Sequence, residues 1–335
     1  MLPRLLLLSC LAVIAPLSAL ARAPDATAVN RFVNEMAREH KFDTRQLQQL
    51  FREARIQQSI LDAISRPAES KPWHEYRPIF LTADRSRGGV AFWNANQDIL
   101  TRANRVYGVP AEILIAIIGV ETRYGKNTGN YRVLDALTTL AFAYPPRSRF
   151  FRKELKEYLL MTREEGLPAD GQLGSYAGAM GIPQFIPSSF RRYAVDFDHD
   201  GKRDLWTSTA DAIGSVANYF KAHRWHPGEP VVSAVKVHGK RYEALIDGNL
   251  KPRHTPQQLM DNGVLLPRGL PANLQGSLIR LEGSNGPEYW VGWHNFYVIS
   301  RYNHSALYSM AVYQLSQDIK ARRMKLASET LPERQ

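Results

Sequence analysis

The sequence predicts an α+β protein that is mainly helical, and three observations carry this prediction. Apolar residues recur at helical spacing through most of residues 29–222 and again through 306–327. A nearly wholly apolar stretch, residues 111–125, is long enough for a helix that is buried on all sides. Runs rich in β-branched and aromatic residues are confined to residues 229–296. Helices therefore dominate, and a small β-rich module interrupts them near the C-terminal end.

The helical part is divided by glycine, proline and polar segments. Residues 29–66 have the periodicity of two amphipathic helices. Residues 67–78, which contain Trp73 and Tyr76, are expected to form a linking loop because prolines punctuate them. Further helices are expected at residues 92–107, 111–125, 133–142, 150–165, 188–195 and 208–222, with a glycine-rich loop at 171–187.

The character of the sequence changes after residues 225–228. Strands are expected at residues 231–237, 276–282 and 288–291, separated by glycine, asparagine and proline turns. Helical periodicity returns at residues 306–327. The β-rich module therefore spans about residues 229–296.

The first residues predict export. A short basic stretch ending at Arg4 precedes an apolar run to Leu20, and cleavage after Ala21 fits the small-x-small rule. Residues 1–21 are thus expected to be a signal peptide. It contains Cys10, the single cysteine of the 335 residues. The preceding residues resemble a lipoprotein box only faintly, so we expect Cys10 to be removed and the mature chain to hold no disulfide or thiolate metal site.

Composition and charge narrow the range of partners. A hydrophobic content of 44% with 22% charged residues is typical of a globular protein, and no later segment approaches the apolar length that spans a membrane, so we expect a soluble mature protein. The net charge of +11 favours a polyanionic partner: nucleic acid, an anionic membrane surface or an acidic cell-wall polymer. Because the charge forms no long basic tract and an export signal comes first, nucleic acid is disfavoured.

Glu121 is the first candidate functional residue. It lies at the end of the apolar helix, with only Arg123 as a cation in its own turn. Desolvation disfavours the charged form of a carboxyl group and raises its pKa, and a carboxyl that stays protonated near neutral pH suits general acid catalysis. The alternative is a glutamate that reaches from a core helix to solvent or to Arg123.

The glycine-rich loop is the second candidate. Three glycines within residues 174–185 allow the backbone to come close to a ligand or to another helix. Ser175, Tyr176 and Gln184 add neutral hydrogen-bonding groups, and Phe185 adds an apolar surface. Such groups suit carbohydrate better than phosphate. The alternative is a loop that only packs helices together.

An acidic segment, residues 196–204, is the third candidate. Aspartates at alternate positions followed by glycine match the opening of an EF-hand calcium loop. Thr207 stands where such a loop carries a bidentate glutamate, so either Asp211 closes a longer loop or Asp204 acts through water. A solvated acidic turn is the alternative to a metal site. The expected calcium ligands are Asp196, Asp198, Asp200, Asp211 and the backbone carbonyl of Lys202.

A fourth cluster lies between the β-rich module and the last helix. Arg301, Tyr302, Asn303 and His304 follow one another at a junction, which is a common place for residues that contact a ligand. His304 alone is expected to form a hydrogen bond at a helix start. The other histidines show no metal-binding spacing.

Five motifs occur in one order along the chain. They are Gly119-Val-Glu-Thr-Arg-Tyr-Gly125, Gly174-Ser-Tyr-Ala-Gly-Ala-Met-Gly181, Val195-Asp-Phe-Asp-His-Asp-Gly201, Asp211-Ala-Ile-Gly-Ser-Val-Ala-Asn-Tyr-Phe220 and Ser300-Arg-Tyr-Asn-His304. Together they resemble the B-type lytic murein transglycosylases of the bacterial cell envelope, and the similarity runs from about residue 29 to 320. It implies a goose-lysozyme-like catalytic core, an α-domain, a small β-rich domain and an EF-hand-like metal site.

The resemblance also implies roles for single residues. Glu121 becomes the single catalytic acid and base. Two departures from the family are visible: Ile182-Pro183 replaces a pair that often contains glycine, and the segment before Asp211 is one residue longer. The residues implied in saccharide binding are Tyr76, Arg147, Ser175, Gln184, Phe185, Tyr219, Tyr302, Asn303 and Tyr308.

The implied domain order places a signal peptide at residues 1–21 and the first part of the α-domain at 22–75. The catalytic core follows at 76–228, the β-rich domain at 229–296, and a segment that completes the cleft and the α-domain at 297–335. Calcium is expected to be structural, and no organic cofactor is expected. The expected partners are peptidoglycan glycan strands and other cell-wall enzymes, not nucleic acid, and the expected state is a monomer in the periplasm.

The resemblance implies an unusual route of bond cleavage. Ordinary glycosidases use two carboxylates, whereas here the next acidic residue after Glu121 is Asp135, and the fold decides whether a second carboxylate comes close. The implied reaction cleaves the bond between N-acetylmuramic acid and N-acetylglucosamine and closes a 1,6-anhydro ring. Two alternatives stay open: a hydrolase on the same scaffold, and a binding protein that does not need Glu121.

Overall fold

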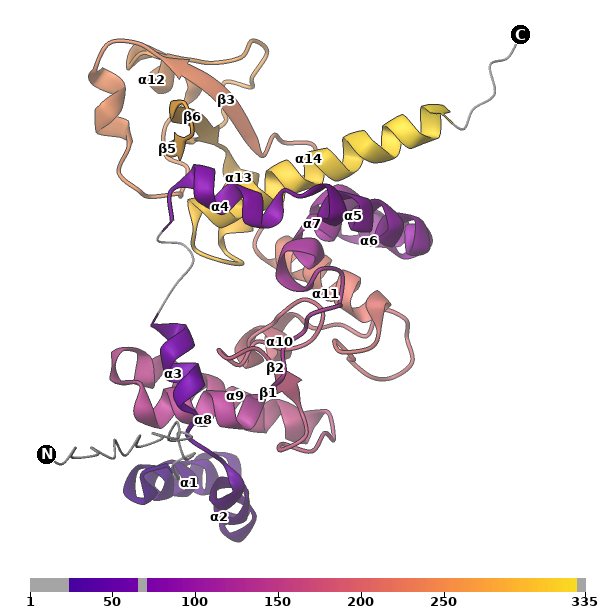
Figure 1. Ribbon diagram of the computed structural model, residues 1–335, viewed down its shortest axis with the longest axis vertical. Helices are drawn as coiled ribbons and strands as arrows, with labels where there is room; N and C mark the ends of the chain where they lie inside the picture. The colour runs from indigo at the N-terminus through magenta and orange to yellow at the C-terminus, as the bar shows by residue number, and fades with distance from the viewer. Residues whose placement is uncertain (1–23, 66–70, 330–335) are drawn as a thin grey trace, which may run out of the picture.

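The computed structural model describes residues 24–65 and 71–329, and it shows the predicted α+β fold with a majority of helices (Figure 1). The predicted signal peptide with Cys10 lies outside the described residues. The helices are α1 (Ala26–His40), α2 (Thr44–Glu53), α3 (Gln58–Ile64), α4 (Trp73–Phe80), α5 (Ala83–Ala95), α6 (Gln97–Tyr107), α7 (Ala111–Thr122), α8 (Val133–Ala143), α9 (Ser148–Glu164), α10 (Pro187–Tyr193), α11 (Thr209–Ala222), α12 (Pro256–Asp261), α13 (His294–Ser300) and α14 (Ala306–Glu329).

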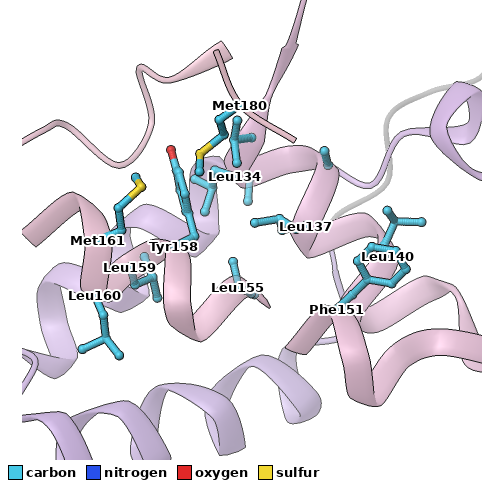
Figure 2. Close-up of a cluster of buried hydrophobic side chains, with 14 of the residues drawn as sticks. Leu134, Leu137, Leu140, Phe151, Leu155, Tyr158, Leu159, Leu160, Met161 and Met180 are labelled. Atoms are coloured by element: carbon cyan, nitrogen blue, oxygen red, sulfur yellow. The ribbon is translucent and has the colours of Figure 1, made fainter. Parts of the chain in front are cut away.

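One hydrophobic cluster joins α1, α2 and α3 to α8 and α9. Apolar residues of α8 and α9 face one another at its centre (Figure 2). Met180, from the glycine-rich loop, reaches into the same cluster and is fully buried there. The loop is therefore anchored in this core by a side chain as well as by its backbone.

A second hydrophobic cluster surrounds α7 with α5, α6, α11, α13 and α14. Every residue from Ile113 to Val120 is buried, as expected for a helix that is apolar on all sides. The absence of a side chain at Gly119 leaves room for the ring of Tyr124, because a Cβ there would lie 2.7 Å from that ring. The central position of α7 fixes where its C-terminal end emerges.

The β-rich module is an antiparallel sheet with strand order β4-β3-β6-β5. One face packs against α4, α13 and α14, and the other packs against α12, which lies beside the sheet in Figure 1. A separate two-stranded sheet pairs β1 with β2 near the glycine-rich loop. The strands are β1 (Tyr131–Arg132), β2 (Leu173–Gly174), β3 (Val232–Val237), β4 (Val264–Leu265), β5 (Ser277–Gly283) and β6 (Gly286–Gly292).

The prediction of two helices within residues 29–66 is wrong in one respect. The second predicted helix is divided into α2 and α3. The break is stabilised by α8: the backbone N–H of Arg55 donates to Asp135 Oδ1 at 2.9 Å, and that of Gln57 donates to Thr139 Oγ1 at 3.0 Å. The N–H of Arg55 thus bonds to a side chain 80 positions away in the sequence and not to a backbone carbonyl of its own helix. Such partners leave no local signal in the sequence.

The prediction of a linking loop at residues 67–78 is also wrong in part, because the residues from Trp73 onward form α4. Pro78 lies inside this short helix. Burial of Trp73 and Tyr76 against the sheet and α14 outweighs the loss of a backbone donor at the proline. The helix predicted at 92–107 starts earlier, at Ala83, and is interrupted at Asn96 between α5 and α6.

Packing groups the elements differently from the predicted domain boundaries, which stay predictions. The cluster around α8 and α9 unites residues from both sides of the boundary at 75/76.

Among the described residues, no single helix is long and apolar enough to cross a membrane. Only α6 and α7 taken together reach that length and composition, and they are bent by 113°.

Candidate active site

A cavity of about 640 Å³ opens where the end of α7, the glycine-rich loop, α11 and the turn after α13 come together. Glu121 lines this cavity. So do most of the predicted saccharide-binding residues, namely Arg147, Ser175, Gln184, Phe185, Tyr219, Tyr302 and Asn303.

Glu121 lies in the last turn of α7 and is half-buried. The helix ends at the next residue, and Arg123 takes the left-handed backbone conformation that closes it, with φ of 50°. The buried guanidinium of Arg85 donates to the carbonyl oxygen of Gly119 at 3.0 Å. A cation at these terminal carbonyls interacts favourably with the helix dipole, so the end of α7 is held in place.

Tyr308, from α14, lies behind Glu121. Its hydroxyl donates to Glu121 Oε1 at 2.5 Å. Burial, followed by the neighbouring charge of Glu121, raises the pKa of Tyr308 well above its ordinary value, so the phenol stays protonated and remains a donor. Because Tyr308 occupies Oε1, a proton on the carboxyl group belongs on Oε2.

Tyr302 supports the opposite side of the site. Its hydroxyl donates to the carbonyl oxygen of Pro183 at 2.5 Å, and burial, followed by the charge of Glu121, raises its pKa well above the ordinary value. Thr122 Oγ1 donates to the carbonyl oxygen of Ile182 at 2.8 Å. The pair at 182–183 thus ties the loop to both α7 and Tyr302.

The glycine-rich loop folds tightly on itself. The N–H of Met180 donates to the carbonyl of Phe185 at 2.8 Å, and the reverse bond is 3.1 Å long. Ser175 Oγ accepts from the N–H of Ala179 at 3.0 Å. Gln184 has a φ of 53°, and its side-chain amide donates to two backbone carbonyls at 2.9 and 3.0 Å. These bonds fix the positions of the polar side chains at the cavity wall.

Aromatic rings form the floor of the cavity. The ring centroids of Phe185 and Tyr219 are 5.8 Å apart, and those of Tyr219 and Tyr302 are 4.9 Å apart. The hydroxyl of Tyr219 donates to the carbonyl oxygen of Arg301. Burial, and then the charge of Arg301, lowers the pKa of His304, which favours a neutral imidazole. Neutral polar groups over aromatic faces suit a sugar chain.

Two of the predicted saccharide-binding residues lie outside the cavity lining. Tyr76 is buried in α4, where its ring lies 5.1 Å from that of Phe80. Tyr308 is buried behind Glu121, to which it donates its hydroxyl proton. Tyr308 therefore contacts Glu121 from the protein side of the carboxyl group, and the ring of Tyr76 packs in the core beside Phe80.

Sequence reasoning missed several residues that line the cavity. Phe150, at the start of α9, is one of them, and its ring lies 4.6 Å from the guanidinium of Arg147. Its only signal in the sequence is that it lies close to Arg147. Tyr176, Arg301 and His304 also line the cavity; they belong to the candidate segments named from the sequence, although the family resemblance gave them no saccharide-binding role.

Among the described residues, Glu121 is the only aspartate or glutamate that lines the cavity. Asp135, the next acidic residue in the sequence, is buried at the start of α8. There it pairs with Arg132 at 2.9 Å and accepts from the N–H of Arg55. Its carboxylate is committed to holding α8 against the break between α2 and α3.

The acidic loop brings three carboxylates together. Oxygen atoms of Asp196, Asp198 and Asp211 lie within 4.8 Å of one another. Asp211 is fully buried and accepts from the N–H groups of Phe197 at 2.6 Å and Asp204 at 2.8 Å. Burial raises the pKa of Asp211, and hydrogen bonds oppose this. Crowded hard oxygens of this kind fit a calcium ion.

The remaining predicted ligands are placed differently. Asp200 lies outside the group of three, and its Oδ1 accepts from the N–H of Lys202 at 2.9 Å. Asp204 accepts from the backbone N–H groups of residues 206 and 207. Of the two residues considered for closing the loop, Asp211 is therefore the one that joins the other carboxylates.

Comparisons with known proteins agree with this geometry. The family model described as the transglycosylase SLT domain matches residues 24–317. The chain is 45% identical over 305 residues to the membrane-bound lytic murein transglycosylase B of Escherichia coli (strain K12), and this match covers 88% of the chain and 83% of that protein.

Solved structures give the same result. The soluble lytic transglycosylase SltB1 from Pseudomonas aeruginosa is 53% identical with a TM-score of 0.83, and the match covers 88% of this chain and 99% of that one. The Escherichia coli lytic transglycosylase Slt35 in complex with calcium is 43% identical with a TM-score of 0.82, and the match covers 89% of this chain and 94% of that one. SltB3 from Pseudomonas aeruginosa in complex with NAG-NAM-pentapeptide is 34% identical with a TM-score of 0.77, and the match covers 87% of this chain and 78% of that one.

The fold and the cavity around Glu121 thus define a lysozyme-like enzyme. The chain belongs to the transglycosylase SLT domain family. Within this family, the protein is a lytic murein transglycosylase.

Proposed function

We propose that the protein cleaves the β-1,4 bond between N-acetylmuramic acid and N-acetylglucosamine in peptidoglycan and leaves a 1,6-anhydro end, with Glu121 as both acid and base. The observation that carries this proposal is the cavity in which, among the described residues, Glu121 is the only carboxylate. A second carboxylate is what a water-using glycosidase needs on the opposite face of the sugar. The complex of the related SltB3 with NAG-NAM-pentapeptide supports the substrate class.

The first half of the reaction is a proton transfer. Glu121 Oε2 donates its proton to the glycosidic oxygen, the bond from this oxygen to C1 breaks, and the N-acetylglucosamine side leaves with a 4-hydroxyl group. The positive charge that develops at C1 is stabilised by the carbonyl of the substrate's own 2-acetamido group. Tyr308, bonded to Oε1, holds the carboxyl group in one orientation throughout.

The second half returns the proton. Glu121, now a carboxylate, removes the proton of the C6 hydroxyl, and O6 attacks C1 to close the 1,6-anhydro ring. The acetamido carbonyl is released, and Glu121 is protonated again for the next cycle. No water enters the balance, so one carboxyl group is sufficient.

The cellular setting is part of the proposal. The predicted signal peptide and the cell-wall substrate support a location in the periplasm, where the enzyme acts as a monomer and cleavage serves wall remodelling and turnover. Other cell-wall enzymes are candidate partners.

A structural calcium ion is also proposed. Asp196, Asp198 and Asp211 would hold it, and its positive charge would offset the repulsion between the crowded carboxylates. The calcium complex of the related Slt35 supports this choice of ion.

The decisive experiment is digestion of purified sacculi with mass analysis of the products, wild type beside Glu121→Gln. We expect anhydro-muropeptides from the wild type. Turnover in the Glu121→Gln variant should fall by a factor of about 1000 or more while sacculus binding is kept, because the amide preserves shape and cannot donate or accept the proton.

Other products would contradict the proposal in distinct ways. Reducing N-acetylmuramic acid ends would show a hydrolase on the same scaffold. Equal turnover by wild type and Glu121→Gln would remove Glu121 from the mechanism. Binding without any cleavage by the wild type would show a peptidoglycan-binding protein.

A further inference from the structure

The chain is strained soon after Glu121, where α7 ends. Arg123, Tyr124 and Gly125 take positive φ values of 50°, 65° and 82° in succession. Among the described residues, no other run of three lies in this region of backbone conformation. The left-handed conformation is unfavourable for a residue that carries a Cβ atom, and it persists only where the surrounding structure enforces it. The contacts of Tyr124 supply this enforcement.

The ring of Tyr124 fills a slot that glycines leave open between two helices. Gly88 and Gly89 are consecutive residues inside α5, and Gly119 lies in α7. A Cβ atom would lie 2.8 Å from the ring of Tyr124 at Gly88 and 2.7 Å from it at Gly119. At Gly89 it would lie 2.8 Å from the tyrosine hydroxyl and 2.5 Å from the side chain of Ile319. Adjacent glycines weaken the interior of a helix, and here they give the ring its place.

The hydroxyl of Tyr124 is held by α5 as well. It donates to the carbonyl oxygen of Arg85 at 2.6 Å, and burial raises the pKa of Tyr124, so the phenol stays a donor. The guanidinium of Arg85 donates in turn to the carbonyl oxygens of Gly119 at 3.0 Å and Val120 at 3.4 Å. One residue of α5 therefore holds the chain on both sides of Glu121.

Thr122 ties the same turn to the glycine-rich loop. Its Oγ1 accepts from the N–H of Gly125 at 3.0 Å and donates to the carbonyl oxygen of Ile182 at 2.8 Å. Both Tyr124 and Thr122 lie outside the cavity lining. They can therefore affect the reaction only through the backbone that carries Glu121.

We propose that Tyr124 is a positioning residue: its ring, locked between α5 and α7, fixes the left-handed turn after Glu121 and thereby the direction of the Glu121 carboxyl group. The inference rests on the proposed function, because it takes Glu121 as the group that transfers the proton. Direction is critical in that reaction, since one carboxyl group must reach first the glycosidic oxygen and then the C6 hydroxyl. A rotation of the end of α7 would lengthen both transfers.

The test removes the ring and the hydroxyl in separate variants. In Tyr124→Leu the turn loses its lock, so we expect kcat on soluble glycan strands to fall by roughly a hundredfold. Tyr124→Phe keeps the ring and loses one hydrogen bond, so a fall of about three- to tenfold is expected. KM should stay near the wild-type value in both variants, because the cavity lining is unchanged. Rates are measured well below the Tm of each variant, so that all of the protein is folded.

Tyr158 provides a matched control for the lost hydroxyl. It is buried in the cluster of α8 and α9, and its hydroxyl donates to the carbonyl oxygen of Ala169 at 2.6 Å, the same length as the bond of Tyr124 to Arg85. Tyr158→Phe should lower Tm about as much as Tyr124→Phe does. It should leave kcat unchanged, because the lost bond does not hold the end of α7.

A substitution at Gly88 separates activity from stability. The three atoms nearest to a Cβ at this position all belong to Tyr124. Gly88→Ala in the wild type should therefore displace the ring and lower kcat by about tenfold. In Tyr124→Leu the same alanine has room and favours the helix, so Tm should rise while kcat stays at its low value.

The inference is overturned if the Tyr124 variants keep the wild-type kcat, if they raise KM at constant kcat, or if Tyr158→Phe loses kcat by the same factor as Tyr124→Phe. Recovery of kcat together with Tm in Gly88→Ala/Tyr124→Leu would also overturn it, because the loss of activity would then follow from the loss of stability alone. The proposed reaction fails separately, through the products that the wild type releases from sacculi.

Discussion

Glu121 is supported by a tyrosine and by an arginine that do not line the cavity. Tyr308 donates to one carboxyl oxygen from behind, and Arg85 binds the carbonyl of Gly119 near the end of the same helix. Both contacts come from other helices, α14 and α5, that pack on α7. They hold the carboxyl group in place without adding a second carboxylic acid to the site, as the proposed one-carboxylate reaction requires.

Substitution of Tyr308 by phenylalanine tests this positioning role. The change keeps the ring and removes only the hydroxyl, so we expect kcat to fall by about ten- to a hundredfold while KM stays near the wild-type value, because the carboxyl group loses its orientation and the cavity lining is unchanged. Steady-state kinetics on soluble glycan strands measure the split. Tyr313→Phe in the same helix is the control and should leave both constants unchanged. A rise in KM at constant kcat would instead favour a substrate-binding role for Tyr308.

At this scale the sequence identifies candidate residues but not their contacts. Glu121 stands out because it interrupts an apolar run, which is a local signal. The partner of its carboxyl group lies 187 residues away, and only the packing of α14 on α7 brings the two together. Tyr76 and Tyr308 therefore received a binding role from resemblance alone, while the structure buries both.

The glycine-rich loop shows what an element contributes to the site. Gly181 has a φ of 67°, and a Cβ there would lie 2.3 Å from the carbonyl oxygen of Leu205. The loop therefore passes a neighbouring backbone too closely for any side chain. Its close fit positions Gln184 and Phe185 at the cavity.

Gly181→Ala is predicted to disturb both stability and activity. The free energy of unfolding should fall by about 3 kcal/mol, because the backbone must shift and the alanine is also held at positive φ. Denaturant unfolding and kcat/KM on glycan strands measure the two effects.

Gly166→Ala separates the two causes. Gly166 also has a positive φ, 64°, but nothing lies within 4 Å of the place that a Cβ would take. A loss of only about 1 kcal/mol with normal activity is therefore expected. Equal losses in the two variants would contradict the role of close packing at Gly181.

The acidic loop supplies a second prediction at the scale of an element. Calcium at about 100 times its Kd should add about 2.7 kcal/mol to the free energy of unfolding, which corresponds to a rise of roughly 4 °C in Tm. In Asp198→Asn this rise should be lost, and without calcium the variant should be slightly more stable than wild type because the carboxylates repel one another less. Thermal unfolding with calcium or chelator measures both effects.

A matched variant tests whether the effect belongs to this loop. Asp98 is exposed in the first turn of α6, and Asp98→Asn removes the same charge at a position outside the three carboxylates. It should keep the full response to calcium. The metal site would be rejected if wild type showed no calcium-dependent change in Tm.

The predictability of elements follows from where their stabilising contacts lie. The helix α7 was predictable because its own run of apolar residues indicates a buried helix. The start of α11 was predictable because its N-terminal cap, Ser208, is adjacent in the sequence. The break between α2 and α3 was not, because Asp135 and Thr139 of α8 supply the acceptors. The helix α4 was hidden by Pro78 and depends on burial against the sheet.

For the whole molecule, the cavity around Glu121 lies where two hydrophobic cores meet. Phe185 and Tyr219 belong to the cluster of α8 and α9, whereas Ile182 and Tyr308 belong to the cluster around α7. Tyr302 packs against both. Binary patterning predicts that each helix has a buried face, but not which faces share a core. The meeting of the two cores, and hence the cavity, follows from the fold.

The net charge of +11 predicts a property of the whole molecule, long-range attraction to an anionic polymer. If lactyl and peptide carboxylates attract the protein, sacculus binding by the Glu121→Gln variant should weaken severalfold between about 0.1 M and 1 M salt, as the Debye length falls from about 10 Å to about 3 Å. Co-sedimentation with sacculi measures the bound fraction. Binding of a short chitin oligosaccharide, which carries no charge for the positive surface to attract, should be insensitive to salt over the same range. Sacculus binding that stayed constant or tightened at high salt would show that the positive surface has no part in wall association.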